Sequence, residues 1–172
     1  IIDDADVIAI QEVVAGNGGP DAVGRLHTLL KIDSPSWQVA ISNKTSGPGT
    51  ERYAYFWRGD NIDLVSSKTA LLNTELADLI DREPYVLDFK ASNQIITMVN
   101  FHAVPTNKDP SHEIVQLDEL DPIENDVPTI VMGDFNLGHS KPAFNVIKSH
   151  GLVSQIKGKT ALKNKRKNGE HL

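Results

Sequence analysis

Two apolar stretches that run into polar residues decide how this chain folds: QIITMVNFHAV at Gln94–Val104 and TIVMGDF at Thr129–Phe135. Each is short and rich in apolar and β-branched residues, which is typical of a buried strand. Alternate residues of a strand share a face, so Asn100 and His102 should point the same way. The same spacing relates Asp134 to Asn136. The sequence therefore predicts polar side chains at the points where apolar strands leave the core.

Similar patterns predict the remaining elements. Further strands are expected at Asp6–Val14, Trp37–Ser42, Arg52–Arg58 and Tyr85–Lys90. Helices are expected at Pro20–Lys31, Ser111–Leu120 and Lys141–His150. The first helix should bury Val23, Leu26, Leu29 and Leu30, and the second should bury Ile114, Leu117 and Leu120 while it exposes Glu113 and Glu119. Because strands alternate with helices along the chain, the expected class is α/β with mixed sheets.

Composition excludes several classes of protein. The chain has 172 residues, of which 23% are charged and 40% hydrophobic, and this suits a single soluble domain over residues 1–172. No apolar run is long enough to cross a membrane, so no membrane partner is expected. The absence of cysteine excludes disulfides, thiol nucleophiles and cysteine-built metal sites. No positively charged, apolar signal peptide opens the sequence, and the compartment stays open.

The net charge of −6 is unevenly distributed. Residues 157–172 hold six Lys or Arg and one Glu, a local charge of +5, whereas the other 156 residues carry −11. An acidic body does not attract polyanions unless a metal or a basic patch offsets its charge. The basic tail is interpreted either as a solvated, mobile end or as a segment that meets a phosphate backbone, in which case binding depends on salt.

The polar residues at the strand ends are candidates for a metal site. Glu12 follows the apolar run Val7–Ile10, and His102 and Asp134 likewise stand near the ends of their apolar runs. Carboxylates and an amide carbonyl are hard oxygen ligands, which suit Mg²⁺ or Mn²⁺ better than a soft metal. Each residue also has a purely structural interpretation: Glu12 as a solvated carboxylate, His102 as a hydrogen-bonded core histidine, and Asp134 with Asn136 as an Asx turn.

Four segments in a fixed order carry a more specific signal. They are IAIQEV at Ile8–Val13, ERYAYFWR at Glu51–Arg58, REPYVLDF at Arg82–Phe89, and the pair VNFHAVP at Val99–Pro105 with MGDFN at Met132–Asn136. Together they resemble the endonuclease/exonuclease/phosphatase superfamily over roughly residues 6–140, and the ERY and REP elements resemble its deoxyribonuclease-I-like branch. The resemblance implies two mixed β-sheets packed face to face, with helices on the outer faces of a four-layer sandwich.

The resemblance also implies roles for individual residues. Glu12 is similar to the family's metal-binding glutamate, and Asp134 and Asn136 to the pair that positions the attacking water and contributes to metal binding. His102 resembles the histidine that handles a proton at the scissile phosphate, with Glu51 as the carboxylate that orients it. Arg82, which could instead form a surface ion pair, resembles the arginine that approaches the phosphate, and Asn100 is expected there too. The implied cofactor is Mg²⁺, with Mn²⁺ or Ca²⁺ as alternatives.

Some family features are missing from this sequence. The opening strand with its asparagine and the closing aspartate and Ser-Asp-His are absent, so the chain is expected to be the central part of the fold, incomplete at both ends. In the deoxyribonuclease I branch an arginine and a tyrosine enter the DNA minor groove. Here Val14 and Gly49 occupy those positions, which argues against the same mode of duplex binding.

These observations lead to a ranked set of expected functions. The first is a Mg²⁺-dependent phosphodiester hydrolase that acts on DNA as an endonuclease, with DNA as its partner. Nothing in the sequence points to a specific protein partner. The alternatives are a phosphatase or lipid phosphodiesterase of the same superfamily, or a non-catalytic binding domain if the closing Asp-His is truly absent.

Overall fold

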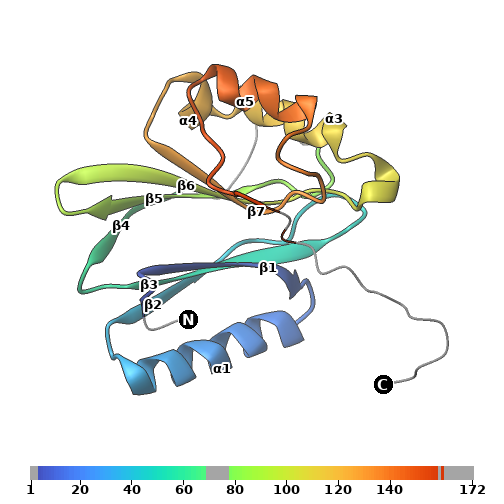
Figure 1. The fold of residues 1–172 in the computed structure, drawn as a ribbon. Coiled ribbons are helices and arrows are strands. Elements are labelled where there is room, and N and C mark those ends of the chain that lie inside the picture. Colours follow the sequence, from blue (N-terminus) through green and yellow to red (C-terminus); the bar gives the residue numbers. More distant parts are fainter. Residues whose placement is uncertain (1–3, 69–77, 159, 161–172) are drawn as a thin grey trace.

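The computed structural model describes residues 4–68, 78–158 and 160, and its strands form two sheets packed face to face between two layers of helices (Figure 1). The first sheet has the strand order β1-β3-β2, and the second has the order β4-β5-β6-β7. The predicted α/β sandwich is therefore confirmed. Beyond residue 160, the basic tail lies outside the described residues.

The first sheet is antiparallel throughout, with β3 at its centre. Its strands are β1 (Val7–Val14), β2 (Trp37–Ile41) and β3 (Glu51–Arg58). The second sheet consists of β4 (Ile62–Lys68), β5 (Tyr85–Ala91), β6 (Gln94–His102) and β7 (Thr129–Asp134). Among the strands of the described residues, only the pair β6 and β7 is parallel, so only the second sheet is mixed.

Helix α1 (Gly18–Asp33) covers the outer face of the first sheet. Its residues Val23, Leu26 and Leu30 pack with β1, β2 and β3 in one apolar cluster. The expected burial of Leu29 is wrong, because this side chain is 62% exposed. Each residue of a helix is rotated by about 100° from the one before, which places Leu29 at the edge of the face that meets the sheet.

Short helices cover the outer face of the second sheet. They are η1 (Thr106–Lys108), α3 (Ser111–Ile114), η2 (Val115–Glu119), α4 (Asp121–Glu124), η3 (Pro142–Phe144) and α5 (Asn145–Ser149). The two helices expected here are thus each broken into an α-helical and a 3-10 segment. Within the described residues no helix is long and apolar enough to cross a membrane.

One side chain of this layer has the opposite burial from that expected. Glu113 in α3 is completely buried, although the helical pattern predicts exposure, while Glu119 is exposed as predicted. The pattern fails because α3 ends at Ile114, after four residues. A single turn does not sustain the periodicity on which the prediction depends.

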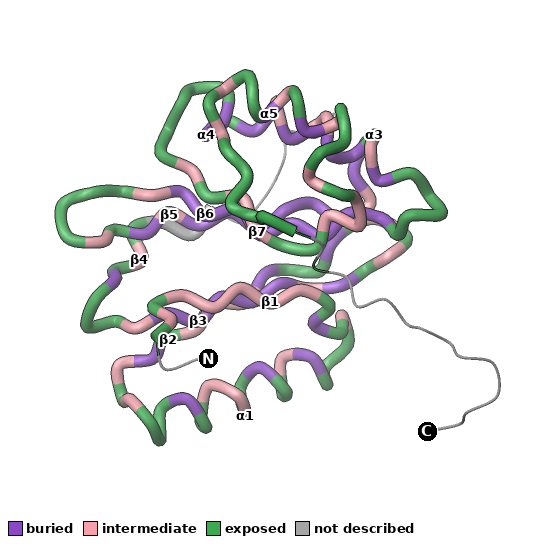
Figure 2. Tube along the Cα trace, in the orientation of Figure 1, coloured by how far each residue is buried: buried purple, intermediate pink, exposed green. Residues whose placement is uncertain are grey.

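One face of β6 points between the two sheets and the other points toward the helices. Met98 packs between the two sheets, whereas Val99 and Phe101 pack against the helices. Alternation therefore directs Asn100 and His102 into the space between the sheets, as the sequence predicts. Figure 2 shows the buried residues along the inner strands and the exposed ones on the outer sides of the helices.

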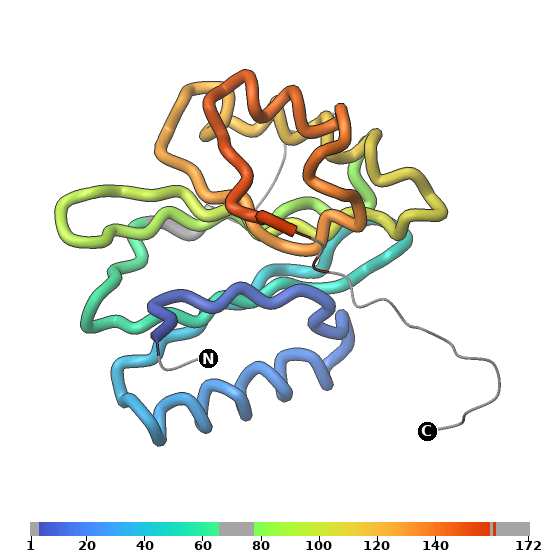
Figure 3. Tube along the Cα trace, in the orientation of Figure 1, coloured from blue at the N-terminus to red at the C-terminus, as the bar shows by residue number. Residues whose placement is uncertain are grey.

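Four strand ends meet on one side of the sandwich. The end of β1 pairs with the start of β3, Val14 opposite Glu51. The parallel strands β6 and β7 end together, with His102 beside Asp134. Figure 3 shows that these ends come from distant parts of the chain. The topology thus brings together polar residues that the sequence keeps far apart.

Candidate active site

A histidine and a glutamate from opposite sheets form the centre of this site. The His102 Nδ1 lies 3.0 Å from both carboxylate oxygens of Glu51. Both residues are buried, with 5% and 7% of their surface exposed. An ionised carboxylate only accepts hydrogen bonds, so the Nδ1 carries the shared proton. In the neutral ring, Nε2 is then the basic nitrogen, and the carboxylate fixes the orientation of the ring.

The surroundings of Glu51 keep it ionised. Its carboxylate accepts the main-chain N–H of Glu12 at 3.1 Å and an Nη1–H of Arg82 at 3.3 Å. Burial by itself raises the pKa of Glu51, but the hydrogen bonds from His102 and Glu12 and the positive charges of His102 and Arg82 outweigh it. The pKa of Glu51 therefore lies below its ordinary value.

Arg82 lies inside this cluster. Its Nε donates to the His102 carbonyl at 3.1 Å and its Nη2 to the Ala103 carbonyl at 2.7 Å, in addition to the bond from Nη1 to Glu51. Because its side chain is only 10% exposed, the surface ion pair considered above is instead a buried one. Its predicted contact with a substrate phosphate stays a prediction.

Asn100 connects the two sheets behind the histidine. It is fully buried, its Nδ2 donates to the Ile10 carbonyl at 3.1 Å, and its Oδ1 accepts a 2.5 Å hydrogen bond from Gln11 Nε2. These bonds join the end of β6 to the end of β1. They place Asn100 next to the site, and its expected role at the phosphate remains a prediction.

Glu12 occupies a distorted part of β1. The register with β3 shifts between Ile10 and Val13, and Glu12 has a φ of 58°. A bulge re-aims a side chain, and strained backbone of this kind clusters at functional sites. The Glu12 side chain is 77% exposed, and its Oε1 lies 3.8 Å from His102 Nε2. Glu12 therefore presents a solvated carboxylate directly beside the histidine.

Asp134 and Asn136 lie at the end of β7, beside the end of β6 that carries His102. The Asn136 N–H donates to Asp134 Oδ1 at 2.9 Å, which is the Asx turn considered as an alternative. Asn136 has a φ of 49°, and its Nδ2 donates to the Ala103 carbonyl at 3.0 Å. Because β7 ends at Asp134, the turn rather than strand alternation orients Asn136.

Tyr53 is a member of this cluster that the sequence reading missed. Its hydroxyl accepts the His102 N–H at 3.2 Å and donates to the Arg82 carbonyl at 3.3 Å. Burial raises the pKa of Tyr53, and the charge of Glu51 raises it further, so the phenol stays protonated. The sequence does contain a signal that Tyr53 lies near the site, since it is two residues from Glu51 and shares its face of β3.

The donors beside His102 suit a hard metal ion in an open site. The described residues contain no group of three His, Cys, Asp or Glu that could hold a metal ion alone. Mg²⁺, however, is usually held by one or two carboxylates, with waters and substrate phosphates as the other ligands. The exposed carboxylates of Glu12 and Asp134 fit this kind of binding.

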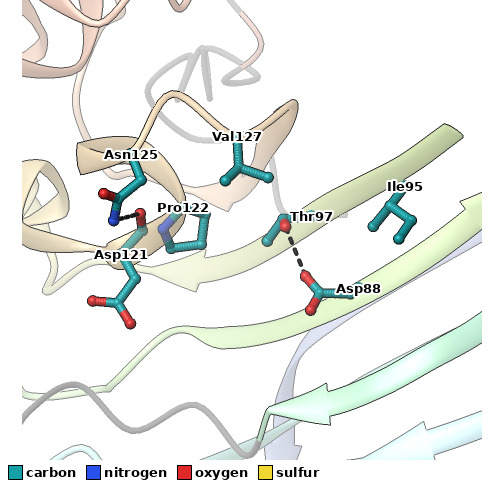
Figure 4. Close-up of a pocket in the computed structure, with 7 residues that line it drawn as sticks. All are labelled: Asp88, Ile95, Thr97, Asp121, Pro122, Asn125 and Val127. Atoms are coloured by element: carbon teal, nitrogen blue, oxygen red, sulfur yellow. Dashed lines mark hydrogen bonds between the residues drawn. The ribbon is translucent and has the colours of Figure 1, made fainter.

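The hollow in Figure 4 is separate from these residues. It encloses about 230 Å³ between α4 and the first half of β6, and it is lined by Asp88, Ile95, Thr97, Asp121, Pro122, Asn125 and Val127. Thr97 lies five residues before His102 and on the other face of β6, where its hydroxyl donates to Asp88 at 2.7 Å. The candidate active site is therefore at the opposite end of the strand.

Solved structures share this fold at low sequence identity. An endonuclease/exonuclease/phosphatase from Bacteroides vulgatus is 17% identical with a TM-score of 0.54, over 86% of this chain and 59% of its own. The 2',3'-cyclic phosphatase ANGEL2 is 22% identical with a TM-score of 0.58, over 85% of this chain and 44% of its own. D. rerio TDP2, complexed with a single-strand DNA product, is 15% identical with a TM-score of 0.55, over 86% of this chain and 53% of its own.

A family match agrees with this likeness. The two sheets and their helix layers define an α/β sandwich of the kind found in these structures. The model of the Endonuclease/Exonuclease/phosphatase family matches residues 1–169, and the chain belongs to this family, whose members are hydrolytic enzymes. A search of curated proteins finds no match. The chain spans between 44% and 60% of the length of these three structures and a humanized form of D. rerio TDP2.

Proposed function

We propose that this chain carries the central part of a divalent-metal-dependent phosphodiesterase that cuts DNA internally. The observation that carries the proposal is the buried contact between His102 and Glu51. A histidine fixed by an ionised carboxylate is suited to transfer a proton at its other ring nitrogen. Its Nε2 faces Glu12 at the solvent-exposed side of the site, where a phosphodiester would bind.

The remaining residues supply the other requirements of phosphodiester hydrolysis. An attacking water has to be aligned, and the negative charge on the phosphate has to be offset. We assign the alignment of the water to Asp134 and Asn136, which share a hydrogen-bonded turn next to His102. Glu12 and Asp134 would hold the metal, which when bound supplies positive charge to the phosphate oxygens.

DNA is proposed as the substrate on two grounds. The ERY segment at Glu51–Tyr53 and the REP segment at Arg82–Pro84 resemble the deoxyribonuclease-I-like branch. One structure with the same fold, D. rerio TDP2, contains a single-strand DNA product. Another, ANGEL2, is a 2',3'-cyclic phosphatase, so phosphatase activity is the main competing proposal.

A plasmid assay with an Asp134→Ala variant tests the proposal. With Mg²⁺, the complete gene product should convert supercoiled plasmid to nicked circles. The variant should be slower by about 100-fold or more, because it loses both the water-aligning turn and a metal-side carboxylate. Asp21→Ala is the matched control, since Asp21 lies on α1 in the opposite outer layer and should leave the rate unchanged.

Two outcomes would reject the nuclease proposal. One is an absence of nicking by the wild-type protein, and the other is an Asp134→Ala variant as fast as wild type. Phosphate release from a phosphomonoester or a cyclic phosphate without plasmid nicking would favour a phosphatase instead.

A further inference from the structure

We propose that Glu113 is a positioning residue, which fixes the main chain that carries His102 and Arg82 from behind the second sheet. It does not reach the reacting atoms itself. Its effect on hydrolysis rests on the proposed function, whereas its effect on the geometry of the histidine does not.

The geometry of Glu113 is that of a main-chain clamp. Its carboxylate is completely buried, and its two oxygens accept hydrogen bonds from different segments of the chain. Oε1 accepts the N–H of Asp81, and Oε2 accepts the N–H of Val104, each at 2.7 Å. Such short bonds to a charged acceptor are stronger than neutral ones. Within the described part of the chain, no basic side chain lies within salt-bridge distance of Glu113.

Both segments that Glu113 holds lead directly into the active site. Asp81 immediately precedes Arg82, and Val104 is two residues after His102. Arg82 in turn donates to the carbonyls of His102 and Ala103. Arg82 therefore holds this stretch of main chain by its carbonyl groups, and Glu113 holds it by the N–H of Val104.

The choice of residue also argues for positioning. An apolar side chain at position 113 would pack equally well, without the cost of removing a carboxylate from water. A carboxylate instead gives directional bonds that hold two main-chain segments in one relative position. The negative charge of Glu113 also acts on the cluster. Burial and the charge of Glu51 are the larger causes that raise the pKa of Tyr53, and the charge of Glu113 raises it as well.

A kinetic comparison separates positioning from stability. Glu113→Gln keeps the size of the side chain but turns an NH₂ group toward one of the two N–H donors. With a chromogenic phosphodiester and the complete gene product, we expect kcat to fall at least about tenfold and KM to change less than about twofold, since positioning acts on the chemical step. Glu119→Gln, an exposed change in the adjacent η2, should leave both constants unchanged.

A destabilised control completes the comparison. Ile123→Ala removes a buried side chain from the same helix layer without touching the clamp. At a temperature where all variants are folded, it should retain wild-type kcat. If Glu113→Gln retains wild-type kcat, or if Ile123→Ala loses as much kcat, Glu113 has a structural role only and the inference is overturned.

A second measurement needs no substrate, and its first part needs no variant. In the NMR spectrum of the unmodified protein, the amide protons of Asp81 and Val104 should be shifted downfield and should exchange slowly with solvent. In Glu113→Gln, the Nδ1 proton of His102 should shift, whereas Glu119→Gln should leave it in place. Rapid exchange of both amides, or an unchanged His102 signal, would overturn the inference even if the protein proves to be a phosphodiesterase. If the shifts occur but no phosphodiester is cleaved, only the proposed function fails.

Discussion

Replacing His102 with glutamine is expected to lower the rate of phosphodiester hydrolysis by about 10²- to 10⁴-fold, the usual contribution of a general acid–base group. Glu51→Gln should have a similar effect, because the buried amide no longer stabilises the imidazolium or fixes the tautomer. The two residues act as one unit, so the double variant should be little slower than either single variant. Initial rates of plasmid nicking measure all three.

A histidine outside the site provides the control for this prediction. His27 in α1 donates a 2.8 Å hydrogen bond from its Nε2 to the Trp37 carbonyl, and it lies in the opposite outer layer. His27→Gln should therefore nick plasmid at the wild-type rate. A His102→Gln variant with more than half of the wild-type rate would contradict the assignment of the dyad. Rate losses that multiply in the double variant would show that His102 and Glu51 act independently.

The second large effect is expected on stability. Gly133 has a φ of 142°, and a Cβ at this position would lie 1.8 Å from the main-chain oxygen of Phe101. Gly133→Ala therefore forces β6 and β7 apart and also strains its own backbone. We expect the free energy of unfolding to fall by about 3 kcal/mol or more. Chemical denaturation, followed by tryptophan fluorescence, measures this loss.

Another glycine near the site serves as the matched control. A Cβ on Gly138 would meet no atom within 4 Å, and its φ lies outside the left-handed region. Gly138→Ala should change the free energy of unfolding by less than about 1 kcal/mol. Equal stability of the two variants would mean that β6 and β7 do not approach each other as described.

Strand alternation explains which parts of the site the sequence predicts well. Asn100 and His102 share the inward face of β6 because the side-chain period of a strand is two, whatever surrounds it. The apolar runs also predict the end of β1 at Val14, while β6 and β7 end two residues and one residue before the predicted Val104 and Phe135. Glu51 is predicted from the family resemblance instead, because it is far from His102 along the chain and no local pattern relates the two residues.

The missed features depend on contacts rather than on periodicity. The edge strand β4 has only three apolar residues at its start, too few to show a pattern. Glu113 belongs to a helix of one turn, and its burial follows from two main-chain donors in other segments. Asn136 is oriented by a turn after β7 has ended. The burial of Glu113 is thus specified by segments distant in sequence, whereas the orientation of Asn136 follows from the local Asx turn that the sequence offers as an alternative to strand alternation.

The Mg²⁺ dependence of plasmid nicking by the complete gene product tests the central claim most directly. Excess EDTA should abolish nicking, and added Mg²⁺ should restore it with a rate that rises and then saturates. That result would agree with a metal held by Glu12 and Asp134 beside the His102–Glu51 pair. Nicking that is equally fast in excess EDTA, or no nicking at any concentration of Mg²⁺, Mn²⁺ or Ca²⁺, would contradict the account.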